Sequence, residues 1–375
     1  ANSRAVLAKP STHSSTFFLT TRTCAVPLDE PSWWYRHDET AVATSLRPFA
    51  ALYGSLTARR MARAGTAVDA AVLCVGNLTA GGSGKTPFVR WLATEIADLT
   101  GRAIAPVILS RGYGGALRGP VPVDPHKHTA SAVGDEPLML SETLPVFVAR
   151  DRLAGAHAIA AAGPRDQRTA IIMDDGLQNP SVRKDLRIAL IDRYRGLGNG
   201  LVVPAGPLRA RVAAQLPHID MVVWTGQKPA ETDAAAAEPP MQLSAFRGPM
   251  IQTWTEPMPV RPDLRERPVI LFTGIANPKR VAQTARNLGL TIASHRTFAD
   301  HHTFTERDAI ALLSKARTTD AALLTTEKDA ARLKGQSGAL AELLSASSVL
   351  RIQLRIAAED RETLRALLTE TLGHR

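Results

Sequence analysis

The sequence predicts an α/β fold with a parallel sheet and a second, smaller α/β domain. Short apolar runs alternate with helical segments from residue 68 to about 226 and again from 269, and continuous apolar runs are typical of strands buried on both faces of a parallel sheet. The chain has 375 residues, more than one hydrophobic core usually organises. One apolar run also leads straight into a glycine-rich turn and a helix.

The expected elements form two series along the chain. The first has strands at 72–75, 107–109, 146–148, 170–173, 188–191 and 221–224, with helices that include 88–99 and 153–162. The second has strands at 269–272, 291–293, 322–324 and 349–356, with helices near 279–288, 306–316 and 361–372. Between them, 241–267 holds short extended pieces at 241–244 and 250–254 and then a run rich in Pro and Arg. We therefore predict a core domain at 67–240, a linker at 241–267 and a smaller α/β domain at 268–375.

The first 66 residues precede this core. Residues 1–30 are rich in Ser and Thr and are expected to be a disordered extension. In the region 31–66, Trp33, Trp34 and Tyr35 precede an apolar segment at 46–56 that is edged by arginines. Such a helix suits a bilayer interface, although it is too short and interrupted to span a membrane. From the residues alone, an amphipathic helix packed on the domain is an equal alternative.

The charge balance favours an anionic partner. Lys and Arg number 45 against 35 Asp and Glu, which gives a net charge of +10. Nucleic acid, acidic phospholipid or a phosphorylated substrate would each suit that surplus. Since the chain shows no zinc-ligand spacing, helix-turn-helix or RNA-binding aromatic signature, we predict no nucleic-acid partner. The two cysteines, Cys24 and Cys74, are far apart and indicate a reducing compartment.

A phosphate-binding loop follows the strand at 72–75. Its residues are Thr79, Ala80, Gly81, Gly82, Ser83, Gly84, Lys85 and Thr86. Glycines let consecutive N–H groups curl around a triphosphate, while the lysine reaches the β- and γ-phosphates and the threonine hydroxyl binds Mg²⁺. The strict pattern has Gly where this chain has Thr79. Despite this departure, the glycines, the lysine and the threonine predict a core like that of P-loop nucleoside-triphosphate hydrolases.

An acidic pair ends another apolar run. The segment 169–173 leads into Asp174 and Asp175, and a carboxylate at the tip of a buried strand beside a phosphate loop holds Mg²⁺ directly or through water. Loop and acidic pair together predict nucleotide binding. They do not choose between a phosphotransferase and a nucleotide switch.

Three further motifs favour transfer to a hydroxyl group. Tyr113 follows a strand in a glycine-rich turn, Asp135 and Glu136 lie in a Gly-Asp-Glu-Pro turn, and His301 and His302 follow an aspartate. A carboxylate can orient an acceptor hydroxyl, and a neighbouring histidine can tune that carboxylate. Taken singly, each motif fits a simple turn or helix cap equally well.

The motifs, taken in order over about residues 31–335, resemble the tetraacyldisaccharide 4′-kinases of lipid A biosynthesis. The runs that carry the resemblance are Gly-Asn-Leu-Thr (76–79), Gly-Gly-Ser-Gly-Lys-Thr-Pro (81–87), Ser-Arg-Gly-Tyr-Gly (110–114), Val-Gly-Asp-Glu-Pro (133–137), Asp-Asp-Gly-Leu-Gln (174–178), Arg-Gly-Leu-Gly-Asn-Gly (195–200), Pro-Ala-Gly-Pro-Leu-Arg (204–209), Gly-Ile-Ala-Asn-Pro (274–278), Asp-His-His (300–302) and Thr-Thr-Glu-Lys-Asp (325–329). This family also begins its phosphate loop with Thr, as at Thr79.

The resemblance implies an ATP-dependent kinase, peripheral to the cytosolic face of the inner membrane of a Gram-negative bacterium. Its substrate would be a tetraacylated glucosamine disaccharide 1-phosphate, phosphorylated on the 4′-hydroxyl. The region 31–66 then becomes a membrane-associating helix and 67–240 a P-loop kinase core. The implied site residues are Lys85 and Thr86 for ATP and Mg²⁺, Asp174 and Asp175 at the acidic strand end, Asp135 as base, His301 as its partner with His302 as second choice, and Arg209, Tyr113 and Glu136 around the nucleotide or phosphate.

The chain departs from the family pattern at two places. Asn179 stands where the family usually has His, and Ala210 where it usually has Glu after Pro-Leu-Arg. The metal site of this chain is therefore expected to differ in detail. A membrane-associated nucleotide switch or assembly ATPase is the alternative function, but 326–329 lacks the spacing of a GTP-specific Asn-Lys-x-Asp motif.

Overall fold

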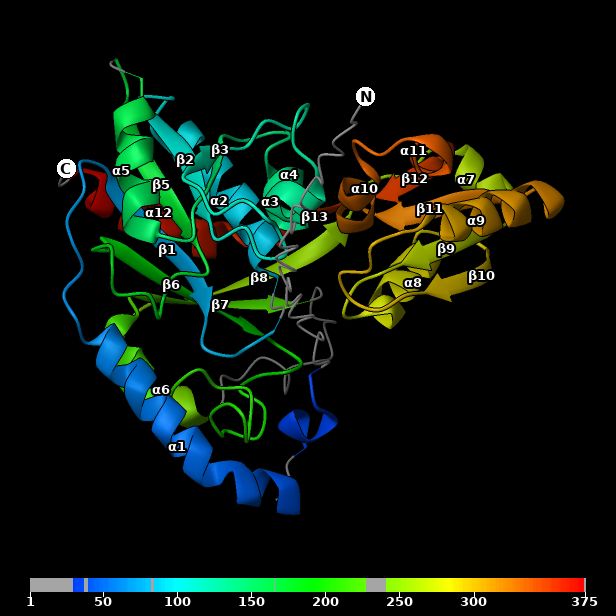
Figure 1. Ribbon diagram of the computed structural model, residues 1–375. Helices are drawn as coiled ribbons and strands as arrows, with labels where there is room; N and C mark the ends of the chain where they lie inside the picture. Colours follow the sequence, from blue (N-terminus) through cyan, green and yellow to red (C-terminus); the bar gives the residue numbers. More distant parts are fainter. Residues whose placement is uncertain (1–29, 37–39, 82–83, 165, 227–240, 374–375) are drawn as a thin grey trace, which may run out of the picture.

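The structure, a computed structural model, describes residues 30–36, 40–81, 84–164, 166–226 and 241–373. The chain forms a larger domain with a mostly parallel sheet and a smaller domain beside it (Figure 1). The predicted fold class is confirmed. Of the predicted extension 1–30, only Glu30 lies within the described residues.

The larger sheet has the strand order β13-β8-β7-β6-β1-β5-β2-β4-β3. Its strands are parallel except that β3 pairs with β4, and β13 with β8, in antiparallel fashion. The strand bounds are β1 (Ala71–Asn77), β2 (Ile104–Ser110), β3 (Val121–Pro122), β4 (Val146–Val148), β5 (Arg168–Asp174), β6 (Leu186–Asp192), β7 (Met221–Gly226), β8 (Met250–Pro257) and β13 (Ile352–Ile356). The central β1 lies between β6 and β5, so the loops after β1 and β5 meet at one edge of the sheet.

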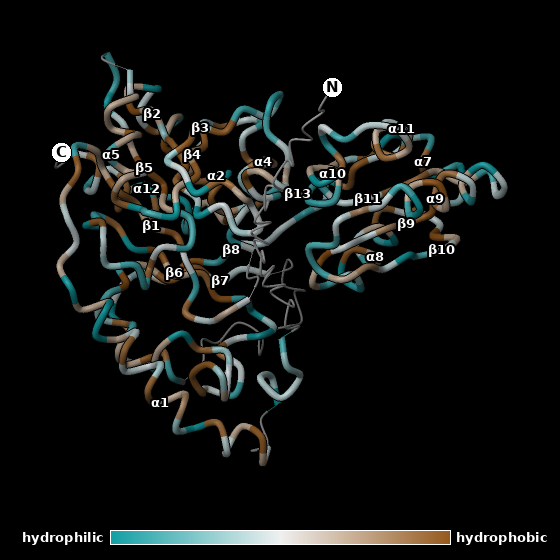
Figure 2. The backbone as a smooth tube through the Cα atoms, viewed as in Figure 1, coloured by the Kyte–Doolittle hydropathy of each residue, from teal (hydrophilic) through white to brown (hydrophobic). Residues whose placement is uncertain are grey.

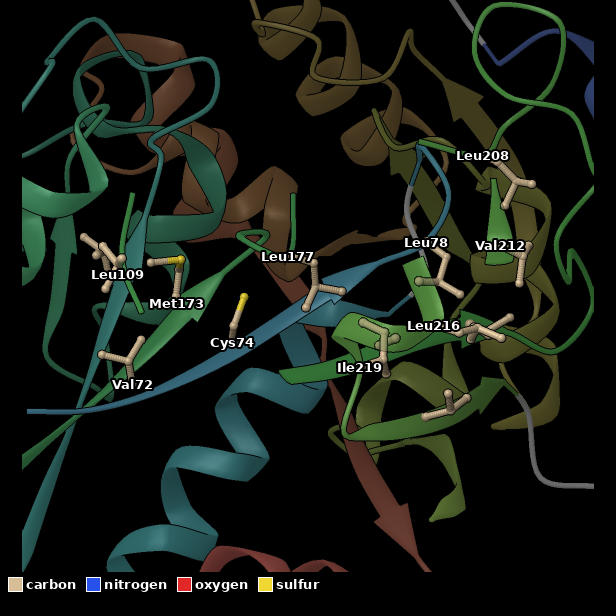
Figure 3. Packing of buried hydrophobic residues seen from close by; sticks show 14 of the residues in the cluster. Val72, Cys74, Leu78, Leu109, Met173, Leu177, Leu208, Val212, Leu216 and Ile219 are labelled. Carbon is tan, nitrogen blue, oxygen red and sulfur yellow. The ribbon is translucent and has the colours of Figure 1, made fainter. Parts of the chain in front are cut away.

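Helices cover both faces of this sheet, which explains why its strands are apolar on both sides. In β1, Leu73 packs with α2 (Lys85–Leu99) and α12 (Ala358–Gly373), whereas Val72 and Cys74 face the opposite cluster. That cluster, shown in Figure 3, also contains side chains from β2, β5 and the segment of α6 and its flanks. Cys74 is buried, as expected. The other helices of this domain are η1 (Ser32–Tyr35), α1 (Ala41–Met61), α3 (Ala130–Val133), α4 (Asp135–Leu140), α5 (Arg152–Ala162), α6 (Val212–Gln215), η2 (Leu216–His218) and η4 (Met241–Leu243).

The smaller domain is a parallel sheet of order β10-β9-β11-β12 between two helical layers. Phe272 on β9 packs toward α9, and Leu271 packs toward α8. The bounds are β9 (Val269–Thr273), β10 (Ile292–Thr297), β11 (Ala322–Thr326), β12 (Ser347–Leu350), α7 (Asp263–Glu266), α8 (Pro278–Asn287), α9 (Glu306–Thr318), α10 (Glu327–Leu333) and α11 (Gly338–Ala346).

The domain boundaries differ from those predicted. The piece assigned to a linker at 241–267 contains β8, which pairs with β7 in the larger sheet. The chain also returns from the smaller domain, because β13 pairs with β8 and α12 packs beneath the larger sheet. Residues 268–375 are therefore not a single domain. The chain therefore passes between the domains twice, after β8 and between β12 and β13. These two connecting segments are hydrogen-bonded to each other, because the N–H of Met258 donates to the carbonyl of Arg351 at 2.9 Å.

Two expected extended segments also differ from the structure. The piece at 241–244 begins with a 3₁₀ turn, η4, so the expected strand there is wrong. The single strand expected at 349–356 is divided at Arg351 into β12 and β13, which belong to different sheets.

Candidate active site

The phosphate loop connects β1 to α2. The side-chain amide of Asn77 donates to the carbonyl of Gly81 at 3.0 Å and tightens the turn. Gly81 and Gly84 have φ values of 98° and 75°, a conformation in which a Cβ atom would be strained. Of the predicted loop, Gly82 and Ser83 lie outside the described residues.

The segment after β6 braces the start of this loop. The N–H of Ala80 donates to the carbonyl of Pro207 at 2.7 Å. Arg209 donates from Nε to the carbonyl of Thr79 at 3.1 Å. The Pro-Leu-Arg motif thus fixes the outer edge of the phosphate loop and brings a guanidinium group beside it.

Asp174 ends β5 and Asp175 follows it directly, and the two carboxylates have contrasting environments. The Asp175 carboxylate accepts from Arg209 at 2.8 Å and lies 3.8 Å from Lys85 Nζ. Burial opposes ionisation of Asp175, but these two cations outweigh it and lower its pKa to about 2. Burial, reinforced by the charge of Glu136, raises the pKa of Asp174 to about 7. The Oδ1 atoms of both aspartates are buried without a hydrogen-bond partner among the described residues.

A carboxylate–histidine pair joins the two domains. Asp135, the first residue of α4, lies 3.0 Å through Oδ2 from Nδ1 of His301, which follows β10. This hydrogen bond raises the pKa of His301. Burial would raise the pKa of Asp135, but the His301 hydrogen bond and the charge of Arg332 hold it well below its usual range. The carboxylate therefore stays ionised.

The other implied residues, Tyr113, Glu136 and His302, have different surroundings. Tyr113 places its ring edge-on to His301, with centroids 5.6 Å apart, and remains largely exposed. Glu136 pairs with Lys328 across the domain boundary. His302, the second choice, instead lies 3.1 Å from Asp308 and stacks on a phenylalanine, so it takes no part in the Asp135 pair.

The phosphate loop and the carboxylate–histidine pair belong to one electrostatic site. Burial opposes ionisation of Glu136, but Lys328 and, to a smaller extent, Lys85 lower its pKa; burial together with the charge of Glu136 raises the pKa of Asp174. The two departures from the family pattern differ in their surroundings. Asn179 accepts from the N–H of Ser181 at 2.8 Å, and Ala210 is buried.

Arg332 is a residue of this site that the motifs did not indicate. It lies on α10, a helix absent from the expected elements, and its guanidinium contacts Asp135 through Nε at 2.9 Å and Nη2 at 2.6 Å. The available signal was its place three residues after the Asp of Thr-Thr-Glu-Lys-Asp, one helical turn along.

Fold and site together are those of a P-loop kinase, since a phosphate loop and a strand-end acid pair share an edge with a carboxylate–histidine pair suited to a hydroxyl acceptor. The family model for tetraacyldisaccharide-1-P 4′-kinase matches residues 42–373. The chain belongs to this family, which confirms the resemblance.

Curated relatives and a solved structure agree with that assignment. The chain is 43% identical over 354 residues to the tetraacyldisaccharide 4′-kinase of Nitrobacter hamburgensis, covering 92% of this chain and 99% of the relative. It is 45% identical over 332 residues to that of Methylorubrum extorquens, covering 88% and 95%. The crystal structure of LpxK from Aquifex aeolicus in complex with ATP matches with a TM-score of 0.67 and 25% identity, covering 88% of this chain and 99% of that one.

Proposed function

We propose that this chain transfers the γ-phosphoryl group of ATP to the 4′-hydroxyl of a tetraacylated glucosamine disaccharide 1-phosphate, a step of lipid A biosynthesis. The observation that carries the proposal is the 3.0 Å contact between Asp135 and His301, beside a phosphate loop. It supplies an ionised carboxylate for an acceptor hydroxyl. Family membership supports the acceptor, and the ATP complex of the Aquifex aeolicus relative supports the donor.

In an in-line transfer, the residues of this site would have separate roles. Lys85 and the N-terminus of α2 stabilise negative charge on the β- and γ-phosphates. Asp135 orients the sugar hydroxyl and takes its proton late, because bond formation to the nucleophile is small in a loose transition state. His301 holds the Asp135 carboxylate in place. Arg209 fixes the phosphate loop and Asp175 together.

The residues beside Lys85 fit a Mg²⁺ ion. Asp174 and Asp175 each have a buried carboxylate oxygen, Oδ1, that lacks a hydrogen-bond partner among the described residues. Thr86 lies in the first turn of α2. Hard oxygen donors of this kind suit Mg²⁺, which keeps several waters and phosphate oxygens as its other ligands. When bound, the ion would neutralise charge on the phosphates.

Replacing Asp174 with asparagine should raise the Mg²⁺ concentration that gives half-maximal activity about tenfold, since the amide keeps the size but not the charge of a ligand. In the unchanged protein, apparent Mg²⁺ affinity should fall as the pH drops below about 7, where Asp174 becomes protonated. Initial rates over a MgCl₂ series would measure both effects. Asp263→Asn, in the smaller domain, is the control, and an unchanged Mg²⁺ requirement in Asp174→Asn would contradict the assignment.

We also propose that α1 attaches the protein to the inner membrane, peripherally and at its cytosolic face. The helix packs closely on the domain at Gly54, where a Cβ atom would lie 3.3 Å from Val202. Its outward side is apolar, with Phe49 and Leu52 exposed by 65% and 64%. Figure 2 shows the apolar stretches along this helix. The exposed large apolar side chains of α1 are Val42, Phe49, Leu52, Tyr53 and Leu56, of which the last four follow helical spacing.

Basic residues at the end of α1 fit this mode of attachment. Arg59 and Arg60 lie in the last turn of α1, where they can meet lipid phosphate. None of the helices in the described ranges combines the length and apolar character needed to cross a bilayer. A surface helix of this kind would bring the site to an acylated substrate at the lipid headgroups.

The variant Leu52→Glu should weaken binding to vesicles of phosphatidylethanolamine and phosphatidylglycerol about tenfold, because partial burial of a leucine contributes roughly 1.5 kcal/mol. Vesicle co-sedimentation measures the change. Ile310→Glu is the matched control, since Ile310 is an exposed apolar residue on α9 of the smaller domain. Equal binding of both variants would contradict the role of α1.

Product analysis tests the proposed reaction. Purified protein, ATP and Mg²⁺ are incubated with tetraacyldisaccharide 1-phosphate in detergent micelles, and the lipid is examined by mass spectrometry and ³¹P NMR. We expect one added phosphoryl group at the 4′ position and no change in a disaccharide already phosphorylated there. An unmodified 1-phosphate lipid would contradict the proposal.

A further inference from the structure

Arg332 contacts residues of both domains. Its side chain is 7% exposed, although α10 belongs to the smaller domain and Asp135 to the larger one. Nε and Nη2 donate to the same carboxylate oxygen, Oδ2 of Asp135, at 2.9 and 2.6 Å. A buried guanidinium is retained only with such partners, because an unpaired charge in this environment is costly.

The other arm of the guanidinium is fixed within the smaller domain. Nη1 donates to Asp329 Oδ1 at 2.8 Å and to the carbonyl of Gly274 at 2.5 Å. Asp329 is fully buried and is itself held by the N–H of Gly274 at 3.1 Å and the hydroxyl of Thr326 at 2.7 Å. These contacts within the smaller domain therefore fix the direction of the Arg332 side chain independently of its contact with Asp135.

Arg332 and His301 share two acceptors. Both contact Oδ2 of Asp135, His301 through Nδ1 at 3.0 Å. Both also donate to the carbonyl of Gly274, His301 through its backbone N–H at 3.1 Å. Consequently, a change in the position of the guanidinium shifts the carboxylate and the histidine relative to each other.

The two oxygens of Asp135 are thereby given different roles. Oδ2 is occupied by Arg332 and His301, whereas Oδ1 accepts one hydrogen bond, from the N–H of Glu136 at 2.9 Å. A carboxylate held on one oxygen presents the other in a fixed direction. Held orientation of this kind matters for transfer, since a displacement of about 1 Å can lower a rate about 10²-fold.

Resting on the proposed kinase function, we propose that Arg332 is the positioning residue of the Asp135–His301 pair. It ties the pair to Asp329 and Gly274 and presents Oδ1 of Asp135 to the acceptor hydroxyl. The charged and titratable groups around the Asp135–His301 pair are Tyr113 from the loop after β2, Glu136 from α4, Asp300 from the loop after β10, and Lys328, Asp329 and Arg332 from α10. Arg332 alone among these donates to Asp135 through two nitrogens.

The experiment compares Arg332→Gln with Glu327→Gln. Glu327 also lies on α10 and pairs with Arg90 of the larger domain at 3.0 Å, but the described contacts of this pair do not include Asp135. In micelle assays, Arg332→Gln should lower kcat for lipid phosphorylation about 10²-fold and leave KM for ATP within about twofold. The acid limb of kcat should move to higher pH, because the Arg332 charge lowers the pKa of both Asp135 and His301. Glu327→Gln should keep the unchanged protein's pH profile.

Arg332→Lys separates positioning from charge. One ammonium group cannot make the contacts of a guanidinium fork, so we expect partial rescue, with kcat about tenfold below the unchanged protein and the acid limb nearer its original position. The inference is overturned if Arg332→Gln and Glu327→Gln lose activity equally with unmoved acid limbs, or if Arg332→Lys has unchanged kcat. Should Arg332→Gln fail to fold by circular dichroism, Arg332→Lys decides. Lack of lipid phosphorylation by the unchanged protein would instead contradict the proposed function.

Discussion

Replacing Lys85 with alanine should lower kcat/KM for lipid phosphorylation about 10³-fold or more. Lys85 begins α2, and its ammonium lies 3.8 Å from Asp175 at the phosphate loop. A cation on the transferring phosphoryl group stabilises the charge of a loose transition state, and loss of such a cation costs about 10³- to 10⁵-fold in related reactions. Initial rates of label transfer from γ-³²P ATP measure the loss.

The control for this variant is Lys315→Ala, which removes an exposed lysine from α9 of the smaller domain. It should retain the activity of the unchanged protein. If Lys85→Ala kept more than a tenth of the activity, Lys85 would not be the main source of charge stabilisation.

Asp135→Asn should lower kcat about 10²-fold, less than the loss in Lys85→Ala. Asparagine keeps the shape of the side chain but cannot take a proton, and general base catalysis contributes about 10²- to 10⁴-fold. We expect the low end because the hydroxyl loses its proton late in a loose transition state. The kcat values of both variants, measured in one assay with saturating ATP and lipid, give the ranking.

A loss in Asp135→Asn equal to or larger than that in Lys85→Ala would contradict a loose transition state. The histidine supplies an independent check. Since the hydrogen bond to Asp135 raises the pKa of His301, that pKa should fall in Asp135→Asn, as followed by NMR of labelled histidine. A matching value in the unchanged protein and the variant would contradict the contact itself.

The phosphate loop and the acidic pair could be predicted because each is a contiguous motif at the end of an apolar strand. Once β1 and β5 are neighbours, with Val75 opposite Asp174, their following loops must meet. The pairing of Asp135 with His301 is different. These residues are 166 positions apart, and only the family resemblance joined them in advance.

Arg332 could not be predicted from the same reasoning. It lies on a short helix outside the expected elements, 197 residues from Asp135, and an arginine in such a segment usually faces solvent. Its burial arises only when α10 packs against α4. A contact that exists only between two domains leaves no periodic or local pattern in the sequence.

The domain boundary was mispredicted for a related reason. The run 349–356 is almost continuous in its strand character, so the break at Arg351 that sends β12 and β13 into different sheets has no clear local signal. Likewise, the extended piece expected at 250–254 falls within β8, but the Pro- and Arg-rich run that follows it led to the prediction of a linker. Strand propensity indicates extended backbone, but not which sheet a strand joins.

The coupling of ATP consumption to lipid phosphorylation tests the central proposal most directly. Labelled lipid and ADP are counted together after incubation of the full chain with γ-³²P ATP, Mg²⁺ and tetraacyldisaccharide 1-phosphate in micelles, with Lys85→Ala alongside. We predict one labelled lipid for each ADP formed, with both products lost in the variant. ADP formation without labelled lipid would contradict the kinase and favour a nucleotide switch or assembly ATPase.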